Sequence, residues 1–138
     1  MEHIFQYSSD IQEIPRIRKE LSELAQSWTI PESELRQISV IIEEIFSNIV
    51  RFAFNDTAVH MIDIKMQYAE RNISIDIFDD GIPFNPLEYD QGPISDPATS
   101  GTGGMGLTLV RTFSDSIVYK RTPQNNHLSI TKIVRSKE

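Results

Sequence analysis

The chain has 138 residues, of which 39% are hydrophobic and 24% are charged, and it contains no cysteine. This composition is typical of a packed globular domain and excludes disulfide scaffolds and thiolate metal sites. The formal charge of −7 argues against nucleic-acid or anionic-membrane binding through a basic surface, but not against a small anion held by backbone N–H groups. We expect a single domain over residues 1–138, located in the cytoplasm, with no signal peptide and no membrane span.

The N-terminal part predicts a strand and a helix. The segment "HIFQYSS" reads as a short strand, and apolar residues then recur at steps of three and four. These residues are Ile11, Ile14, Ile17, Leu21, Leu24 and Trp28. Asp10 and Glu13 fit a capping box, and Pro15 favours a helix start near Ile14, because proline is tolerated only in a first turn.

A second helix is predicted after Pro31 and Ser33, through "LRQISVIIEEIFSNIVRFAF". Its apolar stripe consists of Ile38, Ile41, Ile42, Ile45, Ile49 and Phe52. The next two segments, "HMIDIKMQY" and "NISIDIF", alternate with period two and predict a hairpin whose four-residue loop is "AERN".

Residues 80–104 hold five of the six glycines and four of the seven prolines, which indicates a long, mobile loop. A short helix at "MGLTLVRTFS" and a closing hairpin of "DSIVYKR" and "HLSITKIV" around "TPQNN" complete the chain. The order of elements predicts an α+β fold: a two-layer sandwich in which three helices cover a mostly antiparallel sheet.

Asp79 departs from the pattern of its own strand. It is in phase with Ile73, Ile75 and Ile77, so its carboxylate should face the helix layer, whereas Asp80 should face solvent. A buried carboxylate needs hydrogen bonds. Asp79 therefore either caps a turn or holds a ligand, and Gly81 would let that ligand approach the backbone.

Glu44 and Asn48 are four residues apart and share one helix face at the shoulder of the apolar stripe. One interpretation is an ordinary polar flank. The other is a Mg²⁺ site, in which the Asn48 oxygen joins phosphate oxygens and waters while the neighbouring carboxylate polarises a water or a hydroxyl.

The segment "SGTGGMGL", residues 100–107, lies directly before a predicted helix. Its unobstructed N–H groups and the helix N-terminus favour phosphate binding, although a flexible linker is the alternative. It is not a Walker motif, because no Gly-Lys-Ser/Thr follows. His3, His60 and His127 have no metal-ligand spacing and are interpreted as surface or strand residues.

Three stretches occur in a fixed order: "EEIFSNIVRFAF", "DDGIPFNP" and "GTGGMGLTLVRTFSD". Together they resemble the N box and the two glycine boxes of the GHKL, or Bergerat-fold, ATP-binding domain of histidine kinases, gyrase, heat-shock chaperones and mismatch-repair proteins. Within that superfamily, "PFNP" and "GMGLTLVRTFSD" are most similar to the anti-sigma-factor serine/threonine kinases of bacterial partner-switching systems. The resemblance covers essentially the whole chain.

The resemblance implies ATP and Mg²⁺ as cofactors and a role for each matching residue. Asp79 would accept a hydrogen bond from the adenine amino group, and Gly81 would let the purine lie against the backbone. Asn48 would coordinate Mg²⁺, and Glu44 would activate the attacking hydroxyl or water. Residues 87–102 would form the ATP lid. The phosphate-wrapping residues would be Gly103, Gly104, Met105, Gly106 and Leu107.

Two positions depart from the family pattern. Phe52 stands where close relatives often carry histidine, so this chain has no histidine to support the ATP site at that position. Many relatives also have Gly-Thr at the start of the last strand, where the threonine supports the adenine-binding aspartate. In "NNHLSIT" the candidates for that support are Ser129 and Thr131.

The resemblance implies an ATP-dependent serine/threonine protein kinase. Its expected partners are an anti-anti-sigma protein, which accepts the phosphate, and a sigma factor or another regulatory target. A homodimer without direct nucleic-acid or membrane contact is expected. Two alternatives are open: a non-catalytic ATP-binding partner-switching module, and a detached histidine-kinase catalytic domain, which would need its acceptor histidine on a separate partner.

Overall fold

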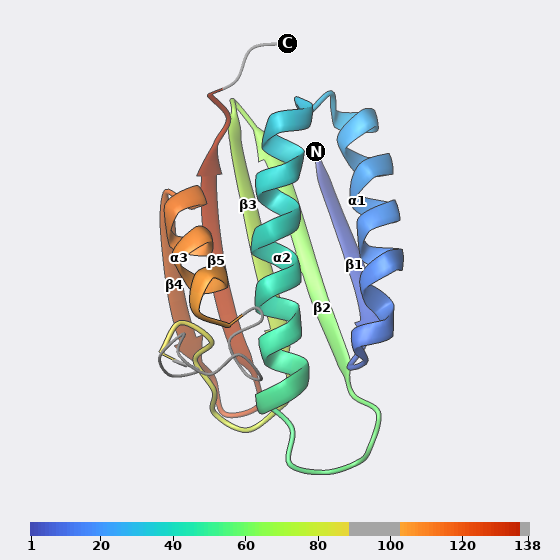
Figure 1. Ribbon diagram of the computed structural model, residues 1–138, viewed down its shortest axis with the longest axis vertical. Helices are drawn as coiled ribbons and strands as arrows, with labels where there is room; N and C mark the ends of the chain where they lie inside the picture. The colour runs from blue at the N-terminus through green and yellow to red at the C-terminus, as the bar shows by residue number, and fades with distance from the viewer. Residues whose placement is uncertain (89–102, 136–138) are drawn as a thin grey trace.

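Five strands and three helices form two layers (Figure 1) in the computed structural model, which describes residues 1–88 and 103–135. The strands are β1 (Glu2–Ser8), β2 (Met61–Ala69), β3 (Asn72–Asp79), β4 (Ser116–Arg121) and β5 (Asn126–Ile133). The helices are α1 (Ile14–Trp28), α2 (Glu32–Phe52) and α3 (Gly103–Phe113), with a 3₁₀ turn, η1 (Ile11–Glu13), before α1. The sheet has the order β1-β2-β3-β5-β4, and every neighbouring pair is antiparallel. The predicted α+β architecture is confirmed.

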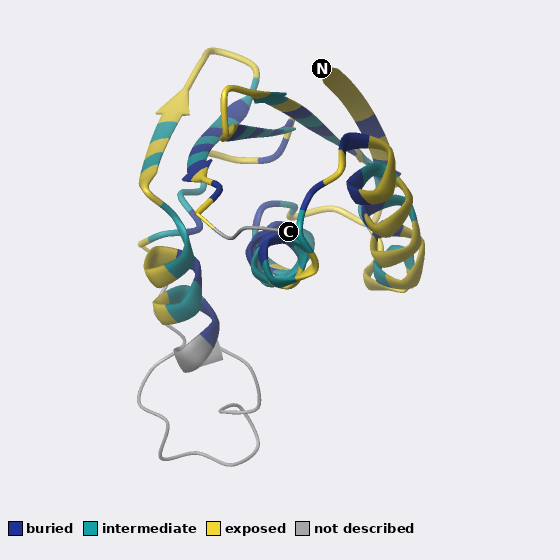
Figure 2. Cartoon of the chain, turned by 90° about the horizontal axis from the view of Figure 1, so that it is seen from above, coloured by how far each residue is buried: buried dark blue, intermediate teal, exposed yellow. Residues whose placement is uncertain are grey.

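The core lies between the sheet and α2, the central helix. All three helices cover one face of the sheet, and no described helix covers the other face (Figures 1 and 2). The predicted stripe of α2 is buried at Ile38, Ile41, Ile42, Ile45 and Ile49. It meets the inward residues of the middle strands, which are Ile62, Ile64, Met66, Ile73, Ile75, Ile77, Leu128 and Ile130.

The start of α1 differs in detail from the sequence prediction. Pro15 lies in the first turn and α1 begins at Ile14, as expected. The Asp10 carboxylate accepts the Gln12 N–H at 2.9 Å, but Glu13 accepts the N–H of Ser8 instead of completing a capping box with Asp10. Because η1 breaks the 3.6-residue period, Ile11 leaves the buried stripe and is exposed.

The β2–β3 hairpin has a two-residue loop, so the prediction of a four-residue loop was wrong. Ala69 and Asn72 still pair, and only Glu70 and Arg71 lie between the strands. Both have positive φ, 51° and 65°, which is the backbone of a type I′ turn. Neither is a usual residue for that conformation, so no residue type indicated the shorter loop.

A buried ion pair joins three elements at the end of the sheet where β5 finishes. Lys132 continues the inward phase of Leu128 and Ile130 and is only 3% exposed. Its ammonium group lies 3.0 Å from the carboxylate of Glu34 on α2 and donates to the Phe113 carbonyl at the end of α3. A cation at a helix C-terminus is favourable, so Lys132 fixes the end of α3.

Among residues 1–88 and 103–135, no helix combines the length and apolar character that crossing a membrane requires.

Candidate active site

Asp79, the last residue of β3, faces the helix layer as its phase predicts and is 3% exposed. Its Oδ1 accepts two hydrogen bonds, from the Gly81 N–H at 2.9 Å and from the Asn126 side-chain amide at 2.8 Å. Within the described residues, Oδ2 accepts none. Burial raises the pKa of this carboxyl, and the bonds from Asn126 and Gly81 oppose that rise. One oxygen is thus fixed by the protein and the other is available to a donor.

Asn126 is the residue that supports Asp79, and the sequence analysis missed it. It lies directly opposite Asp79 in the β3–β5 register. Its amide nitrogen donates to Asp79 Oδ1 and to the Ile82 carbonyl, and its oxygen accepts from the Phe84 N–H and the Tyr119 hydroxyl. All four hydrogen-bonding positions of this amide are used. Asn126 therefore orients Asp79 and has no free donor or acceptor position for a ligand.

The expectation that Ser129 or Thr131 supports Asp79 was wrong. Both alternate with Leu128 and Ile130 and so face the other side of the sheet. The Ser129 hydroxyl donates to Asp76 at 2.7 Å, and Thr131 lies opposite Ser74 in the register. The period-two phase that identified Asp79 also puts Asn126 on the inward face, and that signal was present in the sequence.

Gly81 brings the segment after β3 onto the end of α2. A Cβ at this position would lie 2.3 Å from the backbone oxygen of Ala53. The same oxygen accepts the Ile82 N–H at 2.8 Å, and the Gly81 carbonyl accepts from Arg121 of β4. Only glycine fits this close approach of two backbone segments.

Glu44 and Asn48 lie on the shoulder of α2, as predicted, but Asn48 is not an ordinary polar flank because it is only 2% exposed. The Asn48 side chain is hydrogen-bonded to the Glu44 carboxylate. Burial raises the pKa of Glu44, while the positive charge of Arg51 and the bond from Asn48 lower it. A half-buried carboxylate with a raised pKa is suited to accepting a proton.

The backbone of α3 lies directly against Glu44. A Cβ on Gly106 would be 2.0 Å from Glu44 Cδ and 2.2 Å from its Oε1. The glycine segment and the α2 carboxylate, which are far apart in sequence, therefore meet. Leu107 is half-buried in the same turn, whereas the side chains of residues 103–105, and residues 89–102 of the expected lid, lie outside the description.

Two aromatic rings adjoin the segment between β3 and the lid. Phe52, at the position where relatives often have histidine, lies with its ring centroid 6.0 Å from that of Phe84.

Asp80 faces away from this site, as predicted, and hydrogen-bonds to His60 at 3.0 Å. Leu87, where the expected lid departs, is tied to α3 because its carbonyl accepts from Arg111 at 2.7 Å.

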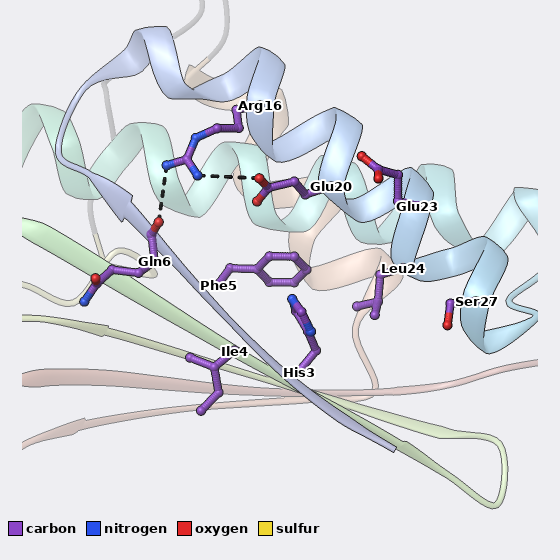
Figure 3. Close-up of a pocket in the computed structure, with 9 residues that line it drawn as sticks. All are labelled: His3, Ile4, Phe5, Gln6, Arg16, Glu20, Glu23, Leu24 and Ser27. Carbon is purple, nitrogen blue, oxygen red and sulfur yellow. Dashed lines mark hydrogen bonds and ion pairs between the residues drawn. The ribbon is translucent and has the colours of Figure 1, made fainter.

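A further groove lies away from these residues. It occupies about 480 Å³ between β1 and α1, and its lining residues include His3, Phe5 and Leu24 (Figure 3). Its guanidinium, Arg16, is already bonded to the Gln6 carbonyl and to the carboxylates of Glu13 and Glu20. None of the predicted site residues lines this groove, so we assign it no role in nucleotide binding.

An antiparallel sheet covered on one face by three helices, with a buried aspartate ending a central strand, is the architecture of a histidine kinase-like ATPase. Residues 7–132 match the family model described as the histidine kinase-like ATPase domain. The chain belongs to this family, and membership implies that it binds ATP.

Two curated proteins are similar in sequence. The serine/threonine-protein kinase BtrW of Bordetella bronchiseptica is 28% identical over 95 residues, which cover 68% of this chain and 67% of that protein. The anti-sigma F factor of Clostridium novyi is 25% identical over 107 residues, which cover 76% of this chain and 71% of that protein.

A solved structure has the same fold. The RsbU and RsbW domains of Rv1364c from Mycobacterium tuberculosis superpose with a TM-score of 0.68 over 97% of this chain, at 12% identity. The match covers 32% of that longer chain.

Proposed function

We propose that the chain is an ATP-dependent serine/threonine protein kinase of the anti-sigma-factor type. It phosphorylates a small anti-anti-sigma-type protein and sequesters a sigma factor or another regulatory target. The names of the two sequence relatives support this proposal. The observation that carries it is the contact between Glu44 and Gly106, which brings a carboxylate of raised pKa to the start of the glycine-rich helix.

Adenine binds at Asp79. Since Asn126 and the Gly81 N–H hold Oδ1, Oδ2 accepts the hydrogen bond from the adenine amino group. Gly81 gives the purine access to the backbone, while Phe52 and Phe84 supply apolar surface nearby. The amides of Gly103, Gly104, Met105, Gly106 and Leu107 hold the phosphates at the start of α3, where the helix dipole is favourable.

The residues present also fit Mg²⁺. Among the described residues, no cluster of three or more histidine, aspartate or glutamate side chains could cage a metal. The oxygen of the buried Asn48 amide suits a hard cation, which takes its remaining ligands from phosphates and waters. When bound, Mg²⁺ neutralises charge on the phosphates.

Glu44 acts on the hydroxyl of the partner's serine. The serine oxygen bonds to the γ-phosphorus as the bond from that phosphorus to the β,γ-bridging oxygen breaks, and ADP leaves. The serine proton passes to the Glu44 carboxylate. Asn48 orients that carboxylate, and the burial that raises its pKa makes it a stronger base than an exposed glutamate. Positioning and charge neutralisation supply most of the acceleration in such a transfer.

Phosphoryl transfer tests the proposal directly. The chain is incubated with γ-labelled ATP and the anti-anti-sigma-type protein of the same genome, and ATP affinity is measured separately by calorimetry. Glu44→Gln should abolish transfer while ATP still binds, and Glu32→Gln, at an exposed site on the same helix, should behave as the wild type. ATP binding by the wild type without any transfer would instead support a non-catalytic partner-switching module.

The resemblance extends the proposal to a homodimer that exchanges partners according to nucleotide and phosphorylation state. A detached histidine-kinase domain is less well supported. The three histidines of the chain lie on β1, in the α2–β2 loop and on β5, so no helix carries an acceptor histidine.

A further inference from the structure

The Glu44 side chain has different surroundings on its two sides. On the α3 side, Gly106 lies so close that even a Cβ would overlap the carboxylate. On the opposite side, Glu44 lines a groove of about 350 Å³ between α2 and the start of α1. In the part of the chain that the structure describes, this groove gives an incoming group a path to the carboxylate.

The groove, which we name the α1–α2 groove, combines an apolar wall with two arginines and two glutamates. Its lining residues are Ile11, Ile14, Arg18, Val40, Glu43, Glu44, Ser47 and Arg51. The Ile11 side chain is a large apolar group exposed on the surface, and it lines the same groove as Glu44. An apolar wall beside a reactive carboxylate suits a side chain that anchors a polypeptide segment.

The two guanidinium groups of the groove differ in their bonding. Arg18 is committed to Glu43 through two hydrogen bonds of 2.7 and 3.0 Å. Arg51, one turn beyond Ser47, makes no hydrogen bond or ion pair within the described residues, and its charge acts on Glu44. A guanidinium that makes no ion pair within the described residues, beside the candidate base, favours an acidic ligand group.

We propose that the α1–α2 groove receives the phospho-acceptor segment of the partner protein. The hydroxyl-bearing residue reaches Glu44, an apolar neighbour packs against Ile11 and Ile14, and an acidic neighbour pairs with Arg51. This inference rests on the proposed kinase function, and it adds the side from which the acceptor enters and the sequence character that it needs. The nucleotide, held by Asp79 and α3, approaches Glu44 from the other side.

Two substitutions test the groove without touching the nucleotide residues. Arg51→Glu reverses the uncommitted charge, and Ile11→Glu adds a charge to the apolar wall at an exposed site. Each should raise the KM for the anti-anti-sigma-type protein by about tenfold or more, because one desolvated contact is lost, while ATP affinity stays within about twofold. Matched controls are Arg36→Glu, on the same helix outside the groove, and Ile4→Glu, on β1, and both should leave the KM unchanged.

Direct binding of the same partner protein, in the presence of a non-hydrolysable ATP analogue, separates the groove from the kinase activity. Weaker binding by Arg51→Glu and Ile11→Glu, but not by the controls, supports the groove even if the wild type transfers no phosphate, and in that case only the kinase proposal fails. Wild-type KM and affinity in both groove variants overturn the groove while leaving the kinase proposal intact. A wild type that neither binds nor phosphorylates the partner overturns both.

Discussion

Asn126 fixes one carboxylate oxygen of Asp79, and the other oxygen accepts no hydrogen bond within the described residues. The two residues are paired across β3 and β5, and the amide of Asn126 donates to Asp79 Oδ1 at 2.8 Å. The same amide is held by Tyr119, Phe84 and Ile82. The orientation of the buried carboxylate therefore depends on the β4–β5 hairpin as well as on the strand that carries it.

Removal of this support should change how ATP binding depends on pH. In the proposed site the Asp79 carboxylate accepts the adenine amino hydrogen, so only its ionised form should bind ATP, and affinity should fall as pH drops through the pKa of Asp79 in the free protein. Burial already raises that pKa, and the bond from Asn126 lowers it. Asn126→Ala should raise it further, so that affinity is lost at a higher pH than in the wild type. Calorimetry from acidic to neutral pH measures this shift.

Tyr119→Phe is the matched control for Asn126→Ala. It removes the hydroxyl that donates to Asn126 but keeps the bond from Asn126 to Asp79. Asn126→Ala should lose about 1–3 kcal/mol of unfolding free energy, since it removes the partner of the Phe84 N–H and of the Ile82 carbonyl. Tyr119→Phe should lose less, since the Asn126 oxygen still accepts from the Phe84 N–H. Only Asn126→Ala should move the pH profile. Coincident profiles for the wild type and Asn126→Ala would contradict the positioning role.

Asp79→Asn should exchange the base preference of the site. The Gly81 N–H and the Asn126 amide both donate to Oδ1, so the oxygen of the new amide should face them. The amide nitrogen then takes the place of Oδ2 and presents a donor to the adenine amino group, which is also a donor. ATP affinity should fall by about a hundredfold, and ITP, which has a carbonyl at that position, should bind better than ATP. Competition calorimetry checks the order, and unchanged ATP affinity would refute the adenine role of Asp79.

Local periodicity explains which features the sequence could predict. The strand and helix stripes, the inward face of Asp79 and the start of α1 at Ile14 all follow from repeats of two or 3.6 residues. Asn126 obeys the same alternation, but it directly follows the turn residues and was interpreted as part of the turn. The length of the β2–β3 loop was predicted wrongly because Glu70 and Arg71 adopt positive φ, although neither is glycine or asparagine.

Contacts between distant segments had no such local signal. The contact of Gly106 with Glu44 depends on how α3 packs beside α2 on the same face of the sheet, which no spacing within either segment encodes. The resemblance to known ATPases put both residues in one site. It did not indicate that residue 106 must be glycine because any side chain there would overlap the Glu44 carboxylate.

The two close-packed glycines of the site should respond differently to alanine. At Gly106 the new Cβ meets the end of the Glu44 side chain, which can move, whereas at Gly81 it meets the Ala53 backbone, which cannot. Gly106→Ala should keep most of the unfolding free energy but lose phosphoryl transfer, because Glu44 is displaced. Gly81→Ala should lose about 1–3 kcal/mol. Urea unfolding and the transfer assay measure the two effects, and equal stability losses would contradict this assignment.

The buried pair of Lys132 and Glu34 should be more sensitive to the loss of one partner than of both. Lys132→Met leaves the Glu34 carboxylate, 4% exposed, without its cation and should cost about 3–5 kcal/mol of unfolding free energy. The double variant Lys132→Met with Glu34→Leu removes both charges and should recover much of that loss, as apolar replacements of buried pairs often do. It still lacks the bonds to the Phe113 carbonyl and to the Arg135 N–H, so recovery should be incomplete. Urea unfolding of the two single variants and the double variant tests the coupling, and strictly additive losses would exclude it. Because the pair holds the end of α3 opposite Gly106, the folded variants should retain wild-type ATP affinity.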